Sequence, residues 1–241
     1  LADYCRKSGI KRIVLGLSGG IDSAVAACVA CAAVGSNNVL GIAMPSRFSS
    51  QHSIEDAKYT AEALGMEFKI EAIDGMHSEL EGKIGEVLDG GNPVASENIQ
   101  SRLRGIIVMA HANAQNRMAI ATGNKSELAQ GYCTLYGDMA GGYTPLGDLY
   151  KMQVYALAEI FNQRALDMQK KPPVNQSTLT KPPSAELAPD QKDEDSLPPY
   201  EVLDEILRLH IEHTKDADDI VASGFDRQVV VDVLGLSLIH I

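Results

Sequence analysis

The sequence lacks the features of a nucleic-acid-binding or membrane protein. Its 21 lysines and arginines are outnumbered by 32 acidic residues, giving a formal net charge of −11, whereas a nucleic-acid surface needs a basic stripe. No apolar run reaches the roughly 18 residues of a membrane span, and no signal peptide is visible. We therefore expect a cytoplasmic protein without nucleic-acid or membrane partners. With 241 residues, 45% of them hydrophobic, the chain is long enough for one globular domain.

Cysteine is scarce as well. Of four cysteines, only Cys28 and Cys31 have the CxxC spacing of a metal or redox site. They lie in the alanine-rich stretch 24–33, and no second pair completes a site, so we interpret them as small core residues. His210 and His213, three residues apart, are interpreted as a solvated helix face in preference to a metal pair.

Strand and helix patterns alternate along the first half of the chain. Short apolar runs predict strands at 11–17, 39–44, 66–73 and 118–122, and longer runs predict helices at 22–34, 53–64 and 96–116. The glycine-rich segment 82–92 predicts a loop. Strands alternating with helices predict an α/β fold with a doubly wound, mostly parallel sheet flanked by helices.

The second half changes character. Helices are predicted at 150–163, 200–213 and 227–234, so the C-terminal region is helical. Seven of the ten prolines fall between 171 and 199, which predicts an irregular segment. We expect flexible segments at 82–96 and 168–199, and a single domain over 1–233. The apolar tail 234–241 has no cap and is predicted to lie outside that domain.

The most informative segment is GLSGGIDS at 16–23, where a predicted strand turns into a helix. Paired glycines let backbone N–H groups approach an anion, and the helix N-terminus adds a partial positive charge. The segment has no lysine, so it is not the GxxxxGK[ST] loop of nucleotide triphosphatases. It also lacks the GxGxxG spacing of dinucleotide-binding folds. It therefore predicts a phosphate loop of another kind.

Two other interpretations remain open for this segment. It formally fits GxSxG, a nucleophile elbow with Ser18 as the nucleophile. That mechanism needs a later acid and histidine, and His210, His213 and His240 all lie in the helical C-terminal region. Labelling of Ser18 by a fluorophosphonate would support it. The third interpretation is a purely structural turn.

Six ordered segments carry a family resemblance. SGGIDS resembles the loop of the ATP-pyrophosphatase superfamily, which has an adenine nucleotide alpha hydrolase-like fold. The chain further resembles NAD synthetase in MPSR (44–47), ENIQSRLRG (97–105), TGNKSE (122–127), GYCTLYGDMAGG (131–142) and KPPSAELAPDQKDEDSLPPY (181–200). It is most similar to the synthetase domain of glutamine-dependent members, because Leu135 stands where ammonia-dependent relatives tend to have lysine.

The resemblance implies a ligase that amidates deamido-NAD to NAD. The nicotinate carboxylate attacks ATP, pyrophosphate leaves, and ammonia displaces AMP from the acyl-adenylate. It also implies Mg²⁺ as a cofactor, a homodimer, and an upstream glutaminase domain that nothing in this sequence resembles. The alternatives are another ATP-pyrophosphatase amidotransferase or thiolation enzyme, and a nucleotide-binding fragment without turnover.

The resemblance also assigns site residues. Asp22 and Glu127 are expected to hold magnesium, and Asp22 and Lys151 to be catalytic. The expected ATP-binding residues are Gly16, Leu17, Ser18, Gly19, Gly20, Ile21, Asp22, Ser23, Met44, Arg47, Thr122, Lys151 and Ser184. The expected deamido-NAD-binding residues are Asn98, Arg102, Glu127, Tyr132, Cys133, Thr134 and Leu135.

Ser184 lies in the proline-rich segment, which we expect to close over ATP as a lid. ATP together with deamido-NAD should then protect residues 171–199 from limited proteolysis. Cleavage at an unchanged rate would refute the lid.

Overall fold

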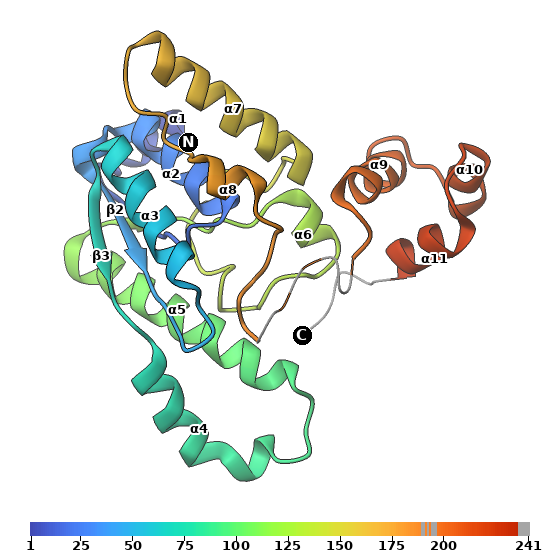
Figure 1. The fold of residues 1–241 in the computed structure, drawn as a ribbon, viewed down its shortest axis with the longest axis horizontal. Coiled ribbons are helices and arrows are strands. Elements are labelled where there is room, and N and C mark those ends of the chain that lie inside the picture. Colours follow the sequence, from blue (N-terminus) through green and yellow to red (C-terminus); the bar gives the residue numbers. More distant parts are fainter. Residues whose placement is uncertain (189–190, 192, 194–196, 236–241) are drawn as a thin grey trace.

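The computed structural model describes residues 1–188, 191, 193 and 197–235. Figure 1 shows a parallel sheet covered by helices, with a separate helical group at the C-terminal end. The strands are β1 (Ile13–Gly16), β2 (Val39–Ala43), β3 (Glu67–Ile70) and β4 (Met118–Ala119). The helices are α1 (Ala2–Ser8), α2 (Ile21–Val34), η1 (Ser36–Asn38), α3 (Gln51–Leu64), α4 (Asp74–Leu88), α5 (Val94–Gln115), α6 (Lys125–Ala129), α7 (Lys151–Asp167), α8 (Gln176–Thr180), α9 (Tyr200–Ile211), α10 (Ala217–Ala222) and α11 (Arg227–Gly235).

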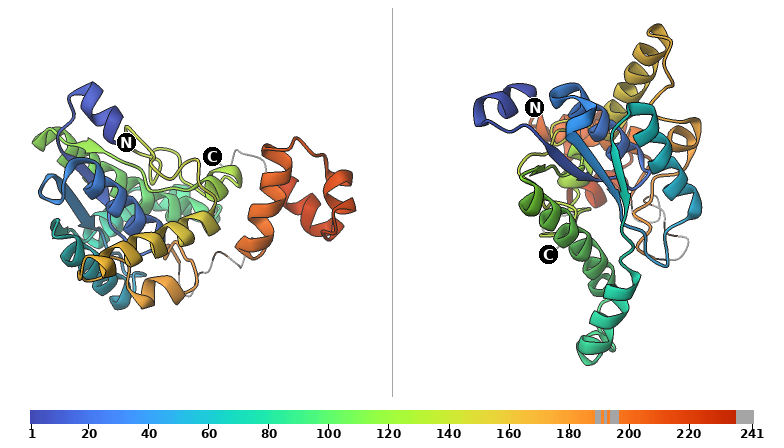
Figure 2. Two further views of the ribbon diagram at one scale, coloured as in Figure 1. Left: turned by 90° about the horizontal axis from the view of Figure 1, so that it is seen from above. Right: turned by 90° about the vertical axis from the view of Figure 1, so that its left-hand side faces the viewer.

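The four strands form one parallel sheet in the order β3-β2-β1-β4. Ile13 pairs with Val39 on one side and with Met118 on the other, so β1 is central. Helices α2 and α3 lie on one face and α5 on the other (Figure 2). The predicted doubly wound α/β fold is therefore confirmed, although each strand is shorter than predicted.

Alternation along the central strands builds a core on each face. Ile13 and Leu15 pack with the alanine-rich side of α2, whereas Val14 packs with Val108 of α5. Burial on both faces explains why these strands are continuous apolar runs. Cys28 and Cys31 lie within α2 on its buried side, which confirms them as core residues.

One prediction of irregular structure was wrong, and a second held except for one short helix. The segment 82–92 is helical as far as Leu88, because α4 continues through Gly82 and Gly85 with a kink at Ile84. No atom lies within 4 Å of the ideal Cβ position of either glycine. Glycine has a low helix propensity, and the backbone between the two glycines departs from helical geometry at Ile84. The proline-rich segment contains the short helix α8, which begins where the Asn175 side chain accepts a hydrogen bond from the Thr178 N–H. Helices α1, α6 and α10 were not predicted.

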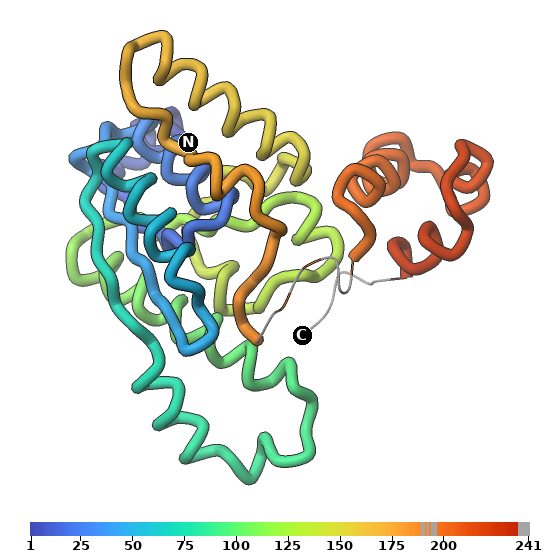
Figure 3. The backbone as a smooth tube through the Cα atoms, viewed as in Figure 1, coloured from blue at the N-terminus to red at the C-terminus, as the bar shows by residue number. Residues whose placement is uncertain are grey.

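The C-terminal helices lie beside the sheet (Figure 3) and share an apolar cluster with Tyr150, the residue that precedes α7. Helix α9 joins this cluster to the rest of the molecule through contacts with α6 and α7. The predicted tail falls largely outside the described residues, since 236–241 are not described. Among the described residues, no helix has both the length and the apolar character to cross a membrane.

Candidate active site

The turn between β1 and α2 holds itself in shape through its own hydroxyl groups. The Ser18 N–H donates to the Ser23 Oγ at 3.2 Å, and that hydroxyl donates to the Gly20 carbonyl at 2.9 Å. The Gly20 N–H donates to the Ser18 Oγ at 3.2 Å. No side chain caps α2, whose first residue is Ile21, so the first N–H groups of the helix remain available to an anion. The turn is therefore shaped to accept an anion, and we call residues 18–23 the cradle.

Gly19 is the residue of this turn that tolerates no side chain. Its φ is +85°, and a Cβ there would lie 2.1 Å from the carbonyl oxygen of Ser53. Ser53 is in the first turn of α3, so Gly19 lets the cradle pack directly against a neighbouring helix. Position 19 therefore requires glycine for two reasons, the positive φ and the close approach of the Ser53 carbonyl.

We expect Gly19→Ala to destabilise the fold much more than Gly9→Ala. Both glycines have a positive φ, which costs an ordinary residue about 1–2 kcal/mol. Gly9 has no atom within 4 Å of its ideal Cβ, whereas Gly19 meets backbone. The difference in melting temperature between the two variants measures the cost of the clash with the Ser53 carbonyl. Equal shifts in melting temperature would contradict this clash.

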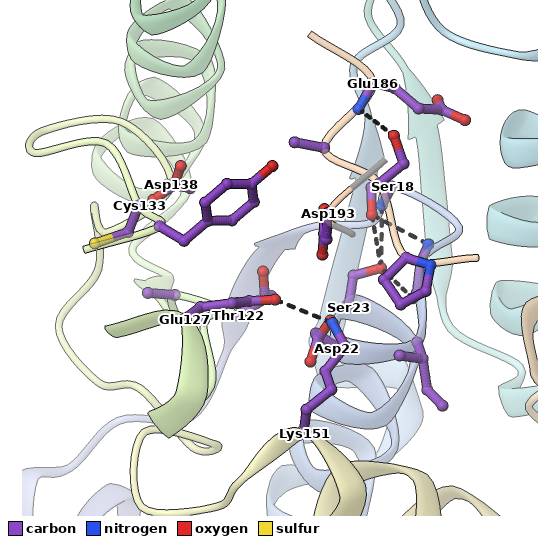
Figure 4. Close-up of a pocket in the computed structure, with 18 of the residues that line it drawn as sticks. Ser18, Asp22, Ser23, Thr122, Glu127, Cys133, Asp138, Lys151, Glu186 and Asp193 are labelled. Carbon is purple, nitrogen blue, oxygen red and sulfur yellow. Dashed lines mark hydrogen bonds and ion pairs between the residues drawn. The ribbon is translucent and has the colours of Figure 1, made fainter. Parts of the chain in front are cut away.

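Two carboxylates and one ammonium meet beside the cradle. The Lys151 Nζ donates to the Asp22 Oδ2 at 2.7 Å and to the Glu127 Oε1 at 3.0 Å. Figure 4 shows Glu127 and Asp22 approaching the ammonium from different sides. Lysine at this position is buried, with 3% of its side chain exposed. The three groups come from α2, α6 and α7, which the fold brings to the carboxyl ends of the strands.

The start of α6 fixes two of these groups. The Asn124 side chain accepts from the Glu127 N–H, and the Glu127 Oε2 accepts from the Asn124 N–H, forming a capping box. The other Asn124 donor, Nδ2, reaches the Asp22 Oδ1 at 2.8 Å. Asn124 was not among the predicted site residues, although the N-x-x-E spacing at 124–127 is a recognisable capping signal.

Burial and charge set the protonation of the cluster. Burial, with the neighbouring Asp22 charge, raises the pKa of Glu127 to about 7. Burial alone would favour neutral Lys151, but the Asp22 and Glu127 carboxylates outweigh it and raise the pKa of that ammonium well above its ordinary value. Lys151 therefore stays charged at neutral pH, whereas Glu127 titrates there.

A second polar layer supports the lysine. The Ser126 Oγ accepts from the backbone N–H of Lys151 at 2.9 Å and donates to the Asp204 Oδ1. The Asp204 Oδ2 accepts from the Met152 N–H at 2.8 Å. Asp204 thus ties α9 to the first turn of α7. It was not predicted because it lies outside every motif segment, just beyond the end of the last one.

Two adjoining cavities lie along this edge of the sheet. The first, of about 260 Å³, contains the acid–lysine cluster and the cradle, and the second has about 240 Å³. Of the predicted residues, the first cavity is lined by Ser18, Gly20, Ile21, Asp22, Ser23, Thr122, Glu127, Tyr132, Cys133, Lys151 and Ser184. The second is lined by Gly16, Leu17, Ser18, Met44 and Thr122.

The remaining predicted residues do not line either cavity. Arg47 turns away, and its Nε donates to Asp74 of α4 at 2.8 Å. Asn98 and Arg102 link α5 to the loop 131–142, because the Asn98 Oδ1 accepts from the Thr134 hydroxyl and the Arg102 Nε donates to the Leu135 carbonyl. These four residues of helix and loop therefore form a surface beside the cavities.

The proline-rich segment lies over the junction of the cavities. Glu186 lines both of them and has a φ of +50°. Its carboxylate accepts from the Ser53 hydroxyl at 2.7 Å and from the Ser50 hydroxyl at 3.0 Å, at the start of α3. Ser184 accepts from the Glu186 N–H at 3.1 Å. These hydrogen bonds therefore tie residues 184–186 to the start of α3.

The geometry does not favour a serine hydrolase. The Ser18 Oγ contacts the Ser23 Oγ and the Gly20 N–H, and no histidine lines either cavity in the described part of the chain. His210 and His213 contact Lys215 and Arg208 on an exposed surface. His240 lies outside the described residues.

Comparisons with known proteins point in the same direction as the geometry. The NAD synthase family model matches residues 1–238. The glutamine-dependent NAD(+) synthetases of Rhodobacter capsulatus and Thermotoga maritima are 50% and 48% identical to 95% and 97% of this chain. These matches cover 42% and 40% of the two relatives, so the chain spans about two fifths of their length.

Solved structures extend the comparison to the fold. A glutamine-dependent NAD+ synthetase from Acinetobacter baumannii, in complex with ADP, matches 98% of the chain with a TM-score of 0.71 and 37% identity, over 41% of its own length. An NMN synthetase from Francisella tularensis also matches 98% of the chain, with a TM-score of 0.78 and 30% identity, over 87% of its length.

Proposed function

The chain belongs to the NAD synthase family, and from that premise we propose that it uses ATP to amidate deamido-NAD to NAD. The observation that carries the proposal is the cluster of Asp22, Glu127 and Lys151 beside an uncapped phosphate cradle. A carboxylate acylates ammonia poorly, so the nicotinate carboxylate must first be activated. ATP activates it by transferring AMP, with pyrophosphate as the leaving group.

The cradle is suited to the two phosphates that ATP loses. The first N–H groups of α2 and the hydroxyls of Ser18 and Ser23 face the first cavity. Fixed donors of this kind stabilise charge that develops on a leaving pyrophosphate without having to reorganise. Lys151 supplies the positive charge that the loop itself lacks. The nicotinate carboxylate then attacks the α-phosphorus in line with the departing group.

Magnesium fits the donor set at this point. Among the described residues no cluster of three or more metal-ligating side chains occurs. Asp22 and Glu127 place two carboxylates beside the cradle, and Mg²⁺ commonly binds through one or two carboxylates together with substrate phosphates and water. When bound there, the ion would neutralise charge on the triphosphate.

The acceptor would lie against α5 and the loop 131–142. Tyr132 and Cys133 line the first cavity, and Arg102 lies one helix turn from Asn98. A guanidinium suits a phosphate or carboxylate of a dinucleotide. This surface borders the cavities, so a dinucleotide on it could present its nicotinate to ATP.

Pyrophosphate release tests the proposed activity. Release over many turnovers should require ATP, deamido-NAD and ammonia together, because the acyl-adenylate of the first turnover occupies the site until ammonia removes it. Exchange of labelled pyrophosphate into ATP should require deamido-NAD but not ammonia. Nicotinate mononucleotide should be a poor substitute, and a preference for it would support mononucleotide amidation instead. Pyrophosphate release that needed neither deamido-NAD nor nicotinate mononucleotide would refute the proposal.

The pH dependence of Mg·ATP binding should follow Glu127. Its carboxyl group has a pKa raised to about 7, so it is neutral below that pH and charged above it. Since the metal needs the charged form, affinity should rise from about pH 6 to about pH 8, with one proton released. By the same linkage, Glu127 favours the unliganded fold at low pH, and this stability is lost as the pH rises through about 7.

The matched variant is Glu127→Gln, because glutamine can keep the capping box while removing the charge. Calorimetry should show weaker Mg·ATP binding and a flat pH profile. A variant that retained the wild-type profile would exclude Glu127 as the titrating group.

We also propose that the chain forms a homodimer in the cytoplasm. Apolar side chains of α5 and of the adjoining loop are exposed, with Ile106 at 64% and Tyr136 at 77%. Gly105 packs within contact distance of Gly137, so these side chains belong to one surface. Such a surface is a candidate interface, and sedimentation of the purified chain measures its oligomeric state.

A further inference from the structure

The side chains of Arg102 and Arg104, both in α5, reach different partners. Side chains that are two residues apart on a helix do not lie on the same face. Arg102 donates to the Leu135 carbonyl in the loop, whereas the Arg104 Nε donates to the Met44 carbonyl at the end of β2, at 3.0 Å. Arg104 lines the second cavity, and Arg102 lines neither.

The second cavity has the walls of a nucleoside site. Apolar side chains from the ends of β2 and β4 and from α5 surround it, among them Ile42, Met44, Val108 and Ile120. A cavity with apolar walls and a few polar groups is typical of a small-molecule site.

The two cavities are continuous. Ser18, Thr122 and Glu186 line both, so a ligand anchored in one extends into the other. With the phosphates of ATP in the cradle, its ribose and base are directed into the second cavity.

The Arg104 guanidinium has donors left over. Its terminal amino groups make no hydrogen bond or ion pair with any other residue that the structure describes. Burial lowers its pKa to about 10, against the opposing effect of the Glu186 and Asp138 charges. It is therefore charged at neutral pH and partly removed from water. A charge-assisted hydrogen bond from such a donor to a ligand is stronger than one made in open water.

We propose that Arg104 binds the nucleoside part of ATP, by donating from its terminal amino groups to a ring nitrogen of the base or a ribose oxygen. The Met44 carbonyl occupies the Nε donor, which leaves the terminal amino groups of this cavity-lining residue for the ligand. This inference rests on the proposed ATP site but adds a contact outside the phosphate cradle. Neither the cradle nor the acid–lysine cluster involves Arg104.

Separate ligands for the two cavities test the proposal. AMP contains the nucleoside, whereas pyrophosphate corresponds only to the two phosphates that the cradle is proposed to bind. By calorimetry, Arg104→Gln should weaken AMP binding about tenfold or more, the scale of one lost charge-assisted hydrogen bond. It should leave pyrophosphate binding unchanged, and Arg104→Lys should recover part of the loss. Thermal unfolding of each variant checks the fold.

Three outcomes would overturn it. The first is unchanged AMP affinity in Arg104→Gln. The second is an equal loss of AMP and pyrophosphate binding with a lower melting temperature, which would indicate a structural arginine. The third is a wild-type chain that does not bind AMP, which would also remove the ATP site. Neither titration uses an acceptor, so a failure of deamido-NAD amidation would leave the role of Arg104 standing.

Discussion

Lys151→Met should abolish nearly all deamido-NAD-dependent pyrophosphate release. The ammonium is the one basic group that the structure places between Asp22 and Glu127, at 2.7 and 3.0 Å. Methionine has a similar length without charge, so it removes stabilisation of the leaving group and leaves two carboxylates to repel one another. Loss of one such fixed group typically lowers turnover by about 100- to 1,000-fold.

The same substitution should destabilise the unliganded chain. Breaking a buried ion pair costs about 3–5 kcal/mol, because the remaining charge is uncompensated. Lys151→Arg separates the two effects. It keeps the charge, and thus most of the stability, but its planar fork cannot occupy the position of a compact ammonium. A Lys151→Arg variant with wild-type turnover would show that a specific ammonium is not required.

Lys125 provides the matched control for Lys151. It also contacts two carboxylates, Asp148 at 3.2 Å and Glu212 at 3.1 Å, but it lines neither cavity. Its partners are solvent-exposed, and exposed ion pairs contribute about 0–1 kcal/mol. Lys125→Met should therefore leave turnover unchanged and alter stability slightly.

Asp22→Asn should lower turnover about 100-fold or more and raise the magnesium concentration that is needed for half-maximal rate. The Asp22 carboxylate accepts from Asn124 with one oxygen and from Lys151 with the other. An amide offers one acceptor only, so one of these donors would face another donor. The substitution therefore removes a charge and disturbs the alignment of the cluster.

Magnesium titrations of pyrophosphate release measure both effects. Asp148→Asn is the control, because Asp148 also accepts from a lysine but its side chain is 98% exposed. Its rate and magnesium requirement should match those of the wild-type chain. If Asp22→Asn lost turnover with no change in its magnesium requirement, Asp22 would act through Lys151 alone, and a role as metal ligand would be refuted.

Regular elements could be predicted from the sequence because their signals are local. Ile13 to Gly16 is apolar on both faces, and the glycine turn and alanine-rich helix follow within a few residues. Elements with weak or conflicting local signals were missed. Helix α4 contains Gly82 and Gly85 yet persists, and α8 depends on a cap within a proline-rich segment.

The sequence by itself determined the α/β fold, the position of the phosphate turn and, through ordered motifs, the family. It could not determine which motif residues face a common cavity. Only the tertiary structure brought Lys151 between Asp22 and Glu127, turned Arg47 toward Asp74, and placed Arg104 in the second cavity. The reason is physical: local patterns set backbone conformation, whereas contacts between residues on different elements, from 24 to 129 positions apart, follow from how the elements pack on the sheet.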